Sequence, residues 1–313
     1  MKNPEKPIDI VCVGEALIDF IGHQEDSNID NTKDYHRYLG GSPTNVAMNM
    51  ARLGLKTSLV ATIGKDGFGD YVLKRLKEVD VTTNYIKESS KFPTSTIFVS
   101  RTSETPDFIA YRAADCHITN EQIPLELLKA SKVFHTTCFA LSKKPAQKTI
   151  LQKAKEAFEL GCKLSIDINY SNKIWSDREE AHQIICQYCA YNPLVKISED
   201  DILRLFGEEK SHSEVFEYFH SLNVDIICLT MGKKGVKLSQ KGKSLINLPA
   251  IKINKVMDAT GAGDAFWSGF LFAHIKGLSV QECLNVALKL AALKLQNVGR
   301  LPDNINILSE LLE

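Results

Sequence analysis

The chain has 313 residues, and 44% of them are hydrophobic, which suits a globular protein with a sizeable core. Lys plus Arg and Asp plus Glu both total 38, so the formal net charge is zero, and we expect neither nucleic acid nor a membrane surface as a partner. Residues 1–7 lack the apolar stretch of a signal peptide, and no run reaches the roughly 18 to 20 apolar residues of a membrane span. The cysteines are scattered along the chain. We therefore expect a cytoplasmic protein with reduced thiols.

Short β-branched runs alternate with longer helical patterns along most of the chain. The predicted strands cover 8–13, 57–63, 132–135, 163–167, 194–197 and 225–230. The predicted helices between them cover 45–53, 70–78, 147–160, 179–188 and 214–222. This alternation predicts an α/β fold, in which a mainly parallel sheet has helices on both faces.

The pattern changes after residue 230. The runs 235–239 and 244–248, joined by Gln-Lys-Gly-Lys, predict a hairpin. Two long helical patterns follow, over 261–276 and 280–297.

Two stretches do not fit the alternation. Residues 18–38 are polar and have no helical period, and residues 93–112 carry two strand-like runs around the turn-forming segment 103–106. We expect both to leave the core and form a small antiparallel flap. Residues 1–313 would then make one domain with a lid.

The strongest motif is Asp258-Ala-Thr-Gly-Ala-Gly-Asp264, which leads into a helical pattern. Gly261 and Gly263 allow backbone N–H groups to converge where the helix begins, and the positive end of the helix dipole favours a phosphate there. Asp264 follows in the first turn, where its carboxylate can serve as a general base for a hydroxyl nucleophile. The alternative is a glycine-rich turn in which Asp264 only caps the helix.

A second glycine turn, Gly40-Gly41-Ser-Pro-Thr-Asn45, also runs into a helix. Asn45 can hydrogen-bond a sugar hydroxyl through both its amide oxygen and its amide nitrogen. The alternative is that Ser42 or Thr44 simply caps a core helix.

A third glycine turn, Thr230-Met-Gly232-Lys-Lys-Gly235, ends a predicted strand. Ligands of open α/β sheets gather beyond the carboxyl ends of strands. A plain turn into the hairpin is the alternative.

Taken together, these motifs resemble the ribokinase/PfkB family of carbohydrate kinases over nearly the full chain. The N-terminal signature is Gly40-Gly-Ser-Pro-Thr-Asn-Val-Ala47 with Gly54 and Gly64 after it, and the C-terminal signature is Asp258 to Leu271. The resemblance implies a three-layer α/β/α ribokinase-like core with a small β-sheet lid. It also implies an ATP-dependent kinase that phosphorylates a hydroxyl of a small sugar.

The resemblance assigns roles to individual positions. Asp264 would be the base that takes the sugar hydroxyl proton, and the N–H groups of Gly261, Ala262 and Gly263 would form an anion hole. The positions that would hold the sugar are Asp19, Gly40, Gly41 and Asn45, and those that would contact the nucleotide are Thr230, Gly232 and Gly235. ATP and Mg²⁺ are the implied cofactors, a requirement for a monovalent cation stays open, and the expected assembly is a homodimer through the lid.

Gly14-Glu-Ala-Leu-Ile-Asp-Phe20, together with the Gly40 motif, is most similar to fructokinases. Tyr111-Arg112 is similar to a lid pair of fructokinases and 2-keto-3-deoxygluconate kinases. Arg112 would contact substrate or phosphate, and the alternative is a solvated lid charge.

Two positions depart from the family pattern. In Asp167-Ile-Asn-Tyr-Ser171-Asn-Lys173-Ile-Trp175, Ser171 stands where relatives carry arginine. The loss of that cation favours a neutral sugar, and our hypothesis is that Lys173 replaces it at the nucleotide.

The second departure is Ser198-Glu-Asp-Asp201, where relatives have Asn-x-x-Glu near Mg²⁺. Asp201 keeps the charge with a shorter reach, so a water would complete its contact with the metal. In the alternative interpretation, Ser198 caps a following helix, and the two roles are compatible.

Three functions are therefore weighed. The first is a fructokinase-like enzyme acting on a neutral sugar. The second is a 2-keto-3-deoxygluconate kinase or another sugar kinase of the family. The third is a non-catalytic sugar- or nucleotide-binding regulator, against which the retained Asp264 and glycine turn argue.

Overall fold

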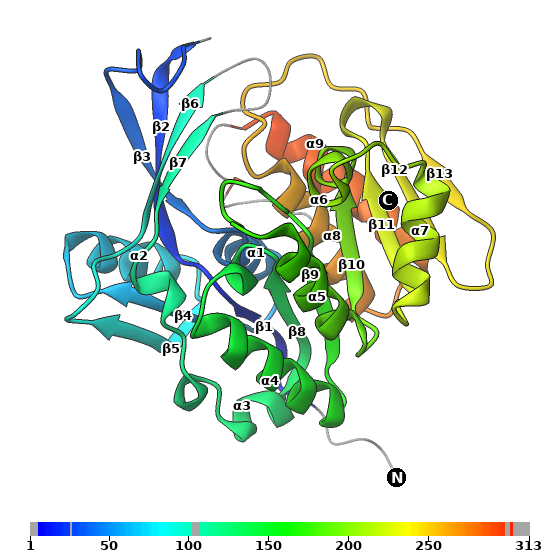
Figure 1. Ribbon diagram of the computed structural model, residues 1–313, viewed down its shortest axis with the longest axis horizontal. Helices are drawn as coiled ribbons and strands as arrows, with labels where there is room; N and C mark the ends of the chain where they lie inside the picture. The colour runs from blue at the N-terminus through cyan, green and yellow to red at the C-terminus, as the bar shows by residue number, and fades with distance from the viewer. Residues whose placement is uncertain (1–5, 26, 102–106, 298–300, 303–313) are drawn as a thin grey trace.

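The computed structural model describes residues 6–25, 27–101, 107–297 and 301–302. The larger of its two sheets has nine strands within these residues, in the order β13-β12-β11-β10-β9-β8-β1-β4-β5 (Figure 1). Seven neighbouring strands run parallel, and β12 and β13 add an antiparallel edge. The strands are β1 (Ile8–Val13), β4 (Thr57–Gly64), β5 (Thr82–Ser89), β8 (Ser131–Thr137), β9 (Lys163–Asp167), β10 (Leu194–Ser198), β11 (Ile226–Thr230), β12 (Val236–Gln240) and β13 (Ile246–Leu248).

The predicted core strands are confirmed, and so is the hairpin of β12 and β13. The bounds of β1 and β9 agree with the prediction. Most residues of β1 are apolar, and most residues of both strands are buried. The edge strand β5 was missed. Its sequence, Thr-Thr-Asn-Tyr-Ile-Lys-Glu-Ser, is half exposed and carries no continuous apolar run.

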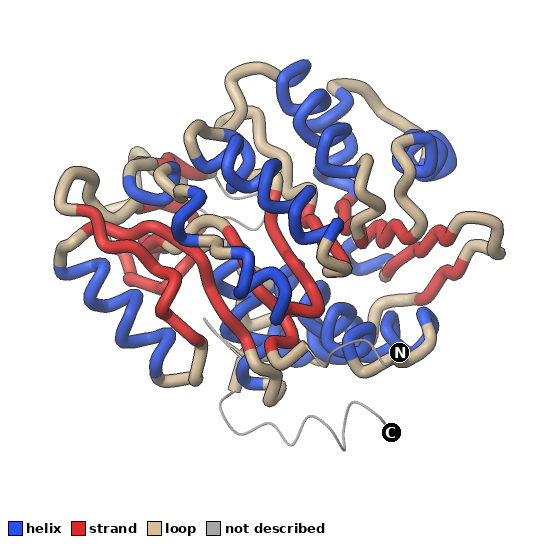
Figure 2. Tube along the Cα trace, turned by 90° about the horizontal axis from the view of Figure 1, so that it is seen from below, coloured by secondary structure: helices blue, strands red, loops and turns tan. Residues whose placement is uncertain are grey.

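Helices cover both faces of this sheet (Figure 2). Alternate residues of β1 show the division, because Val11 and Val13 pack into one apolar cluster while Ile10 and Cys12 pack into the other. The first cluster lies under α3 (Leu125–Ala130), α4 (Ala146–Glu159), α5 (Arg178–Cys189), α6 (Glu199–Phe206) and α7 (His212–Ser221). The second lies under α1 (Ser42–Arg52), α2 (Gly67–Lys77), α8 (Ala262–Ile275) and α9 (Val280–Leu295). The predicted three-layer α/β/α core is confirmed.

Helix α8 contacts both α1 and α9, and most of its residues after the first turn are buried. It is therefore apolar nearly all round, as expected of a core helix. Among the described helices, none is both long and apolar enough to span a bilayer.

A second, four-stranded sheet, called the small sheet below, rises from one side of the core (Figure 1). Its order is β3-β2-β6-β7, built from β2 (Leu17–Glu25), β3 (Tyr35–Gly40), β6 (Thr96–Arg101) and β7 (Phe108–Tyr111). The two excursions expected to leave the core thus come together in one sheet.

The expectation of a purely antiparallel flap is wrong for the central pair. Strands β2 and β6 run parallel, with Ile18 beside Thr96 and Phe20 beside Phe98. Both strands leave the core in the same direction, so each can pair antiparallel only with the strand that returns from its own excursion. The predicted turn at 103–106 lies outside the described residues.

Candidate active site

The turn before α8 brings together two motifs that lie far apart in the sequence. Gly261 has φ 74° and precedes the helix, and Asp264 lies in its first turn. The Asp264 carboxylate accepts a hydrogen bond from Oγ of Ser42 at 2.6 Å and another from Nδ2 of Asn45 at 2.8 Å. No side chain caps the N-terminus of α8, so Asp264 faces the N-terminus of α1 and does not serve as its own helix cap.

The alternative roles of Ser42 and Thr44 as caps are not what the structure shows. Helix α1 has no side-chain cap, because Ser42 donates to Asp264 and Thr44 donates to the carbonyl oxygen of Glu15 at 2.8 Å. Both hydroxyls therefore hold the N-terminus of α1 against other parts of the core.

The glycine pair before α1 makes room for two close approaches. A Cβ at residue 40 would lie 2.2 Å from Oδ2 of Asp19, so glycine is needed for the Asp19 carboxylate to lie across this strand end. A Cβ at residue 41 would lie 2.3 Å from the carbonyl oxygen of Glu15, and Gly41 has φ 100°. The pair thereby lets Asp19 approach α1 and Asp264.

A cavity of about 290 Å³ opens at this place. Asp19, Asn45, Thr260 and Gly261 are among the residues that line it. The sequence-predicted sugar positions Asp19 and Asn45 and the first glycine of the α8 turn thus face one space, with the Asp264 carboxylate bonded to Asn45 beside it.

Burial shapes the acidity of both carboxyl groups. Burial raises the pKa of Asp264 to about 6, although the hydrogen bonds from Ser42 and Asn45 act in the opposite direction. Burial also raises the pKa of Asp19 to about 7, and the like charge of Asp264 adds to the effect. A carboxylate whose pKa lies near neutrality is well matched to accept a proton from a hydroxyl.

A buried ion pair lies behind the turn, and sequence reasoning did not assign it. Lys196 on β10 lies beside Asp167 on β9 in the parallel register, and its Nζ contacts both carboxylate oxygens at 2.9 and 2.7 Å. The side chains are 6% and 2% exposed. A Cβ at residue 263 would lie 3.3 Å from Nζ of Lys196, so Gly263 leaves this ammonium directly beneath the turn.

The sequence feature that could have predicted a buried lysine is its place in the otherwise largely apolar strand Leu-Val-Lys-Ile-Ser of β10. Burial alone would lower the pKa of Lys196, but the nearby carboxylates, Asp167 first, more than offset it and the pKa is raised. The ammonium is therefore charged, and it supplies positive charge beneath the α8 turn.

The predicted anion hole and nucleotide positions fall at two separate turns. The N–H of Ala262 donates to the carbonyl of Ala259 at 3.2 Å, so this predicted donor already has a partner within the turn.

The predicted nucleotide positions follow β11. Thr230 ends this strand, and Gly232 begins the short helical turn Gly232–Lys234. A Cβ at Gly235 would lie 2.1 Å from the carbonyl oxygen of Leu248, so the packing of β13 by itself explains that glycine.

Arg112 is not a solvated lid charge. Its side chain is 7% exposed, it forms an ion pair with Asp115 at 2.5 Å, and its guanidinium stacks over the ring of Phe139 with 4.2 Å to the centroid. Its N–H groups also reach Ser142 and the carbonyl of Phe139. The guanidinium is thus held inside the protein at the base of the small sheet.

Lys173 contacts the small sheet. It forms an ion pair with Asp107 and lies 5.4 Å from the ring centroid of Phe108. Its side chain is 49% exposed, and a surface ion pair of this kind contributes little to stability. A role for Lys173 at the nucleotide stays a prediction.

Ser198 caps α6, as the structural interpretation of this segment expected. Its hydroxyl accepts from the N–H of Asp201 at 3.1 Å, and Oδ2 of Asp201 accepts from the Ser198 N–H at 2.9 Å, which completes a capping box. Asp201 is 5% exposed, and burial raises its pKa. In the part of the chain that the structure describes, no three His, Cys, Asp or Glu side chains cluster in a way that would hold a metal ion.

Comparisons with known proteins agree with this geometry. Residues 7–305 match the model of the pfkB family of carbohydrate kinases. An ATP-dependent 6-phosphofructokinase of Thermoanaerobacterium thermosaccharolyticum is 32% identical over 301 residues, which is 96% of this chain and 91% of the relative.

Two solved structures are also similar. The fructokinase of Halothermothrix orenii has a TM-score of 0.81 and 33% identity, over 91% of this chain and 98% of that one. An uncharacterized sugar kinase of Pyrococcus horikoshii in complex with ATP has a TM-score of 0.84 and 26% identity, over 97% of this chain and all of that one. With the family model spanning nearly the whole chain and Asp264 held at the α8 turn, the protein belongs to the pfkB family and is a carbohydrate kinase.

Proposed function

We propose that this protein transfers the terminal phosphoryl group of ATP to a hydroxyl of fructose. The proposal rests on one observation, namely that Asp264 is hydrogen-bonded to Asn45 at the N-terminus of α8, beside an open cavity that Asn45 and Asp19 line. Similarity to the H. orenii fructokinase supports fructose, and the ATP complex of the P. horikoshii sugar kinase supports ATP.

The proposed chemistry uses groups of this chain in defined roles. Asn45 and Asp19 hold the sugar so that one hydroxyl points to the Asp264 carboxylate, which takes its proton. The sugar oxygen then forms a bond to the terminal phosphorus while the bond to ADP breaks. The N–H groups of Gly261 and Gly263, the positive end of α8 and the Lys196 ammonium behind it stabilise the charge on the phosphoryl oxygens.

The residues fit a Mg²⁺ ion that arrives on the nucleotide. Such an ion keeps several waters and binds through phosphates and one or two carboxylates, so it needs no cage of three protein ligands. Asp201 is the carboxylate that we propose lies near it, because a carboxylate has lone pairs left after accepting from Ser198. The ion would neutralise phosphate charge during transfer. We also propose that the small sheet acts as the lid of the site and that Thr230 and Gly232 contact the nucleotide.

Release of ADP, measured with Mg²⁺ and with or without K⁺, tests this proposal. The acceptors are fructose, ribose, 2-keto-3-deoxygluconate and fructose 6-phosphate, and we expect the largest kcat/KM for fructose. A preference for another acceptor would overturn the choice of sugar and leave the kinase assignment intact. Calorimetric binding of fructose or ATP with no turnover of any acceptor would identify a non-catalytic regulator.

The pH dependence of kcat/KM for fructose follows from the raised pKa of Asp264 in the free protein. The base must be ionised to accept a proton, and the pKa of Asp264 is about 6. We therefore expect kcat/KM to fall as the pH drops through about 6, because this parameter reports the ionisation of the free enzyme. The measurement is kcat/KM for fructose between pH 5 and 8, and a value that stays constant over this range would contradict the assignment.

A further inference from the structure

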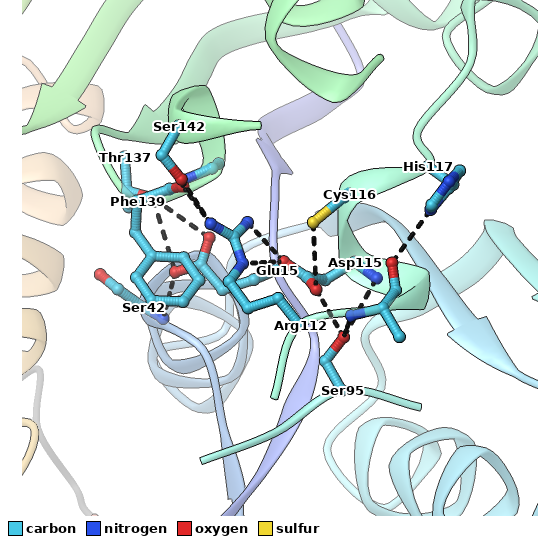
Figure 3. Close-up of polar contacts among 12 residues, drawn as sticks. Glu15, Ser42, Ser95, Arg112, Asp115, Cys116, His117, Thr137, Phe139 and Ser142 are labelled. Atoms are coloured by element: carbon cyan, nitrogen blue, oxygen red, sulfur yellow. Dashed lines mark hydrogen bonds and ion pairs between the residues drawn. The ribbon is translucent and has the colours of Figure 1, made fainter. Parts of the chain in front are cut away.

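One buried polar network ties together the four points where the small sheet joins the core (Figure 3). Glu15 lies just before β2, Ser42 just after β3, Ser95 directly before β6, and Arg112 directly after β7. Each strand of the small sheet therefore meets the core at a residue whose side chain or backbone N–H belongs to this network.

The ends of β6 and β7 are held by Asp115, whose side chain is fully buried. Oδ2 of Asp115 accepts from Nε of Arg112 at 2.8 Å, and Oδ1 accepts from Oγ of Ser95 at 2.5 Å. Ser95 Oγ in turn accepts from the N–H of Ala113 at 2.9 Å. This closed set of hydrogen bonds leaves the two strand ends little freedom to separate.

The ends of β2 and β3 are held by Glu15, which is 2% exposed. Its Oε1 accepts from the N–H of Ser42 at 3.1 Å, and Thr137 donates to its Oε2 at 3.2 Å. Burial raises the pKa of Glu15 to about 8, the positive charge of Arg112 acts to lower it, and the negative charge of Asp115 acts to raise it.

Contacts also join the two halves of the network. A guanidinium N–H of Arg112 donates to the carbonyl of Phe139 at 3.3 Å, and the N–H of the next residue, Ala140, donates to Oγ1 of Thr137 at 3.1 Å, which is the hydroxyl that holds Glu15.

Ser42 connects this network to the reacting group. Its N–H is held by Glu15, and its hydroxyl donates to Oδ1 of Asp264 at 2.6 Å. Glu15 thus holds the backbone of the residue whose hydroxyl orients the Asp264 carboxylate.

We propose that Glu15 and Arg112 are positioning residues that align Asp264 through Ser42, and that they couple the placement of the small sheet to the alignment of the base. This inference rests on the proposed function, in which Asp264 is the base. It also gives Arg112 a role that requires no contact with the substrate.

The test is the pKa of Asp264 in ¹³C-aspartate-labelled protein, measured by NMR and assigned by comparison with Asp264→Asn. This readout does not depend on turnover. We expect Ser42→Ala to raise the pKa of Asp264 by about one pH unit, because it removes a hydrogen bond to the charged form. The other charged groups facing Asp264, which are Asp19, Asp167 and Lys196, stay unchanged.

The double variant Arg112→Gln/Asp115→Asn removes both charges of the buried pair, so that neither is left unpaired. We expect this variant also to raise the pKa of Asp264. Loss of a whole hydrogen bond to the carboxylate corresponds to about one pH unit, so a weakened bond should give a smaller rise, of at least ~0.3 of a pH unit. The triple variant Ser42→Ala/Arg112→Gln/Asp115→Asn should show the same pKa of Asp264 as Ser42→Ala alone, because Arg112 acts through Ser42. Lys132→Gln, which breaks a pair with Asp9 at the start of β1, is the matched control and should leave the pKa unchanged.

Two results would overturn the inference. In the first, Arg112→Gln/Asp115→Asn lowers only the melting temperature and leaves the pKa of Asp264 unmoved, so the pair is merely structural. In the second, it raises KM for fructose without moving that pKa, so Arg112 contacts the substrate. Failure of the proposed function looks different, because the wild type would then not phosphorylate fructose while the NMR readout still reports on the network.

Discussion

Asp264→Asn is expected to lower kcat by roughly 10²- to 10⁴-fold, the range for a positioned general base. Asparagine has nearly the same shape, and its Oδ1 can still accept from Ser42. Its Nδ2 can only donate, so the Asn45 amide must turn over and accept with its oxygen for the turn before α8 to keep its geometry. The substituted asparagine at 264 lacks a carboxylate. It cannot accept the hydroxyl proton at neutral pH. Steady-state kinetics should show the loss in kcat, and calorimetry should show fructose binding within a few-fold of the wild type.

The matched control is Asp200→Asn. Asp200 also lies in the first turn of a helix, α6, but its side chain is 71% exposed and its partner Arg204 is 3.9 Å away. Surface pairs of this kind contribute little, so kcat should stay near the wild-type value. A kcat of Asp264→Asn within tenfold of the wild type would contradict the role of Asp264 as the base.

The core was predictable because its signals are local. Strands such as β11 (Ile226–Thr230) are short apolar runs, and helices such as α4 (Ala146–Glu159) carry a clear apolar face over many residues. The small sheet was predictable only as a departure from this pattern. The pairing of β2 with β6 joins segments more than 70 residues apart, and nothing within either segment specifies a parallel register.

The candidate site likewise contains some residues that local sequence motifs predict and others that only the fold brings together. Asp264 and Asn45 were singled out because each follows a glycine turn that opens a helix, and the structure joins them by a hydrogen bond of 2.8 Å. Glu15 was not assigned a role, because its importance depends on Ser42, Thr137 and Arg112, which surround it only after folding. The role of Lys173 as the missing cation was inferred from its nearness in sequence to Ser171, and it stays a prediction. The ammonium of Lys196 beneath the turn carried no such local signal, because Lys196 reaches that place through the register of two strands.

Lys196→Met is expected to reduce both stability and activity. Removing one partner of a buried ion pair leaves Asp167 as an uncompensated buried charge, which typically costs about 3–5 kcal/mol of the free energy of unfolding. The substitution also removes the positive charge beneath Gly263, so kcat should fall roughly tenfold or more because the anion site loses electrostatic stabilisation. Denaturant unfolding and kinetics at saturating substrate measure the two effects.

The double variant Lys196→Met/Asp167→Leu separates these effects. Replacing both charges by apolar groups removes the unpaired carboxylate of Asp167, so most of the lost stability should return. Asp201, whose pKa the Lys196 charge acts to lower, accounts for the part that does not return. The turn would still lack its ammonium, so kcat should stay low even though the protein is stable. If kcat recovers together with stability, the pair only holds β9 to β10, and the positive charge behind the α8 turn has no part in phosphoryl transfer.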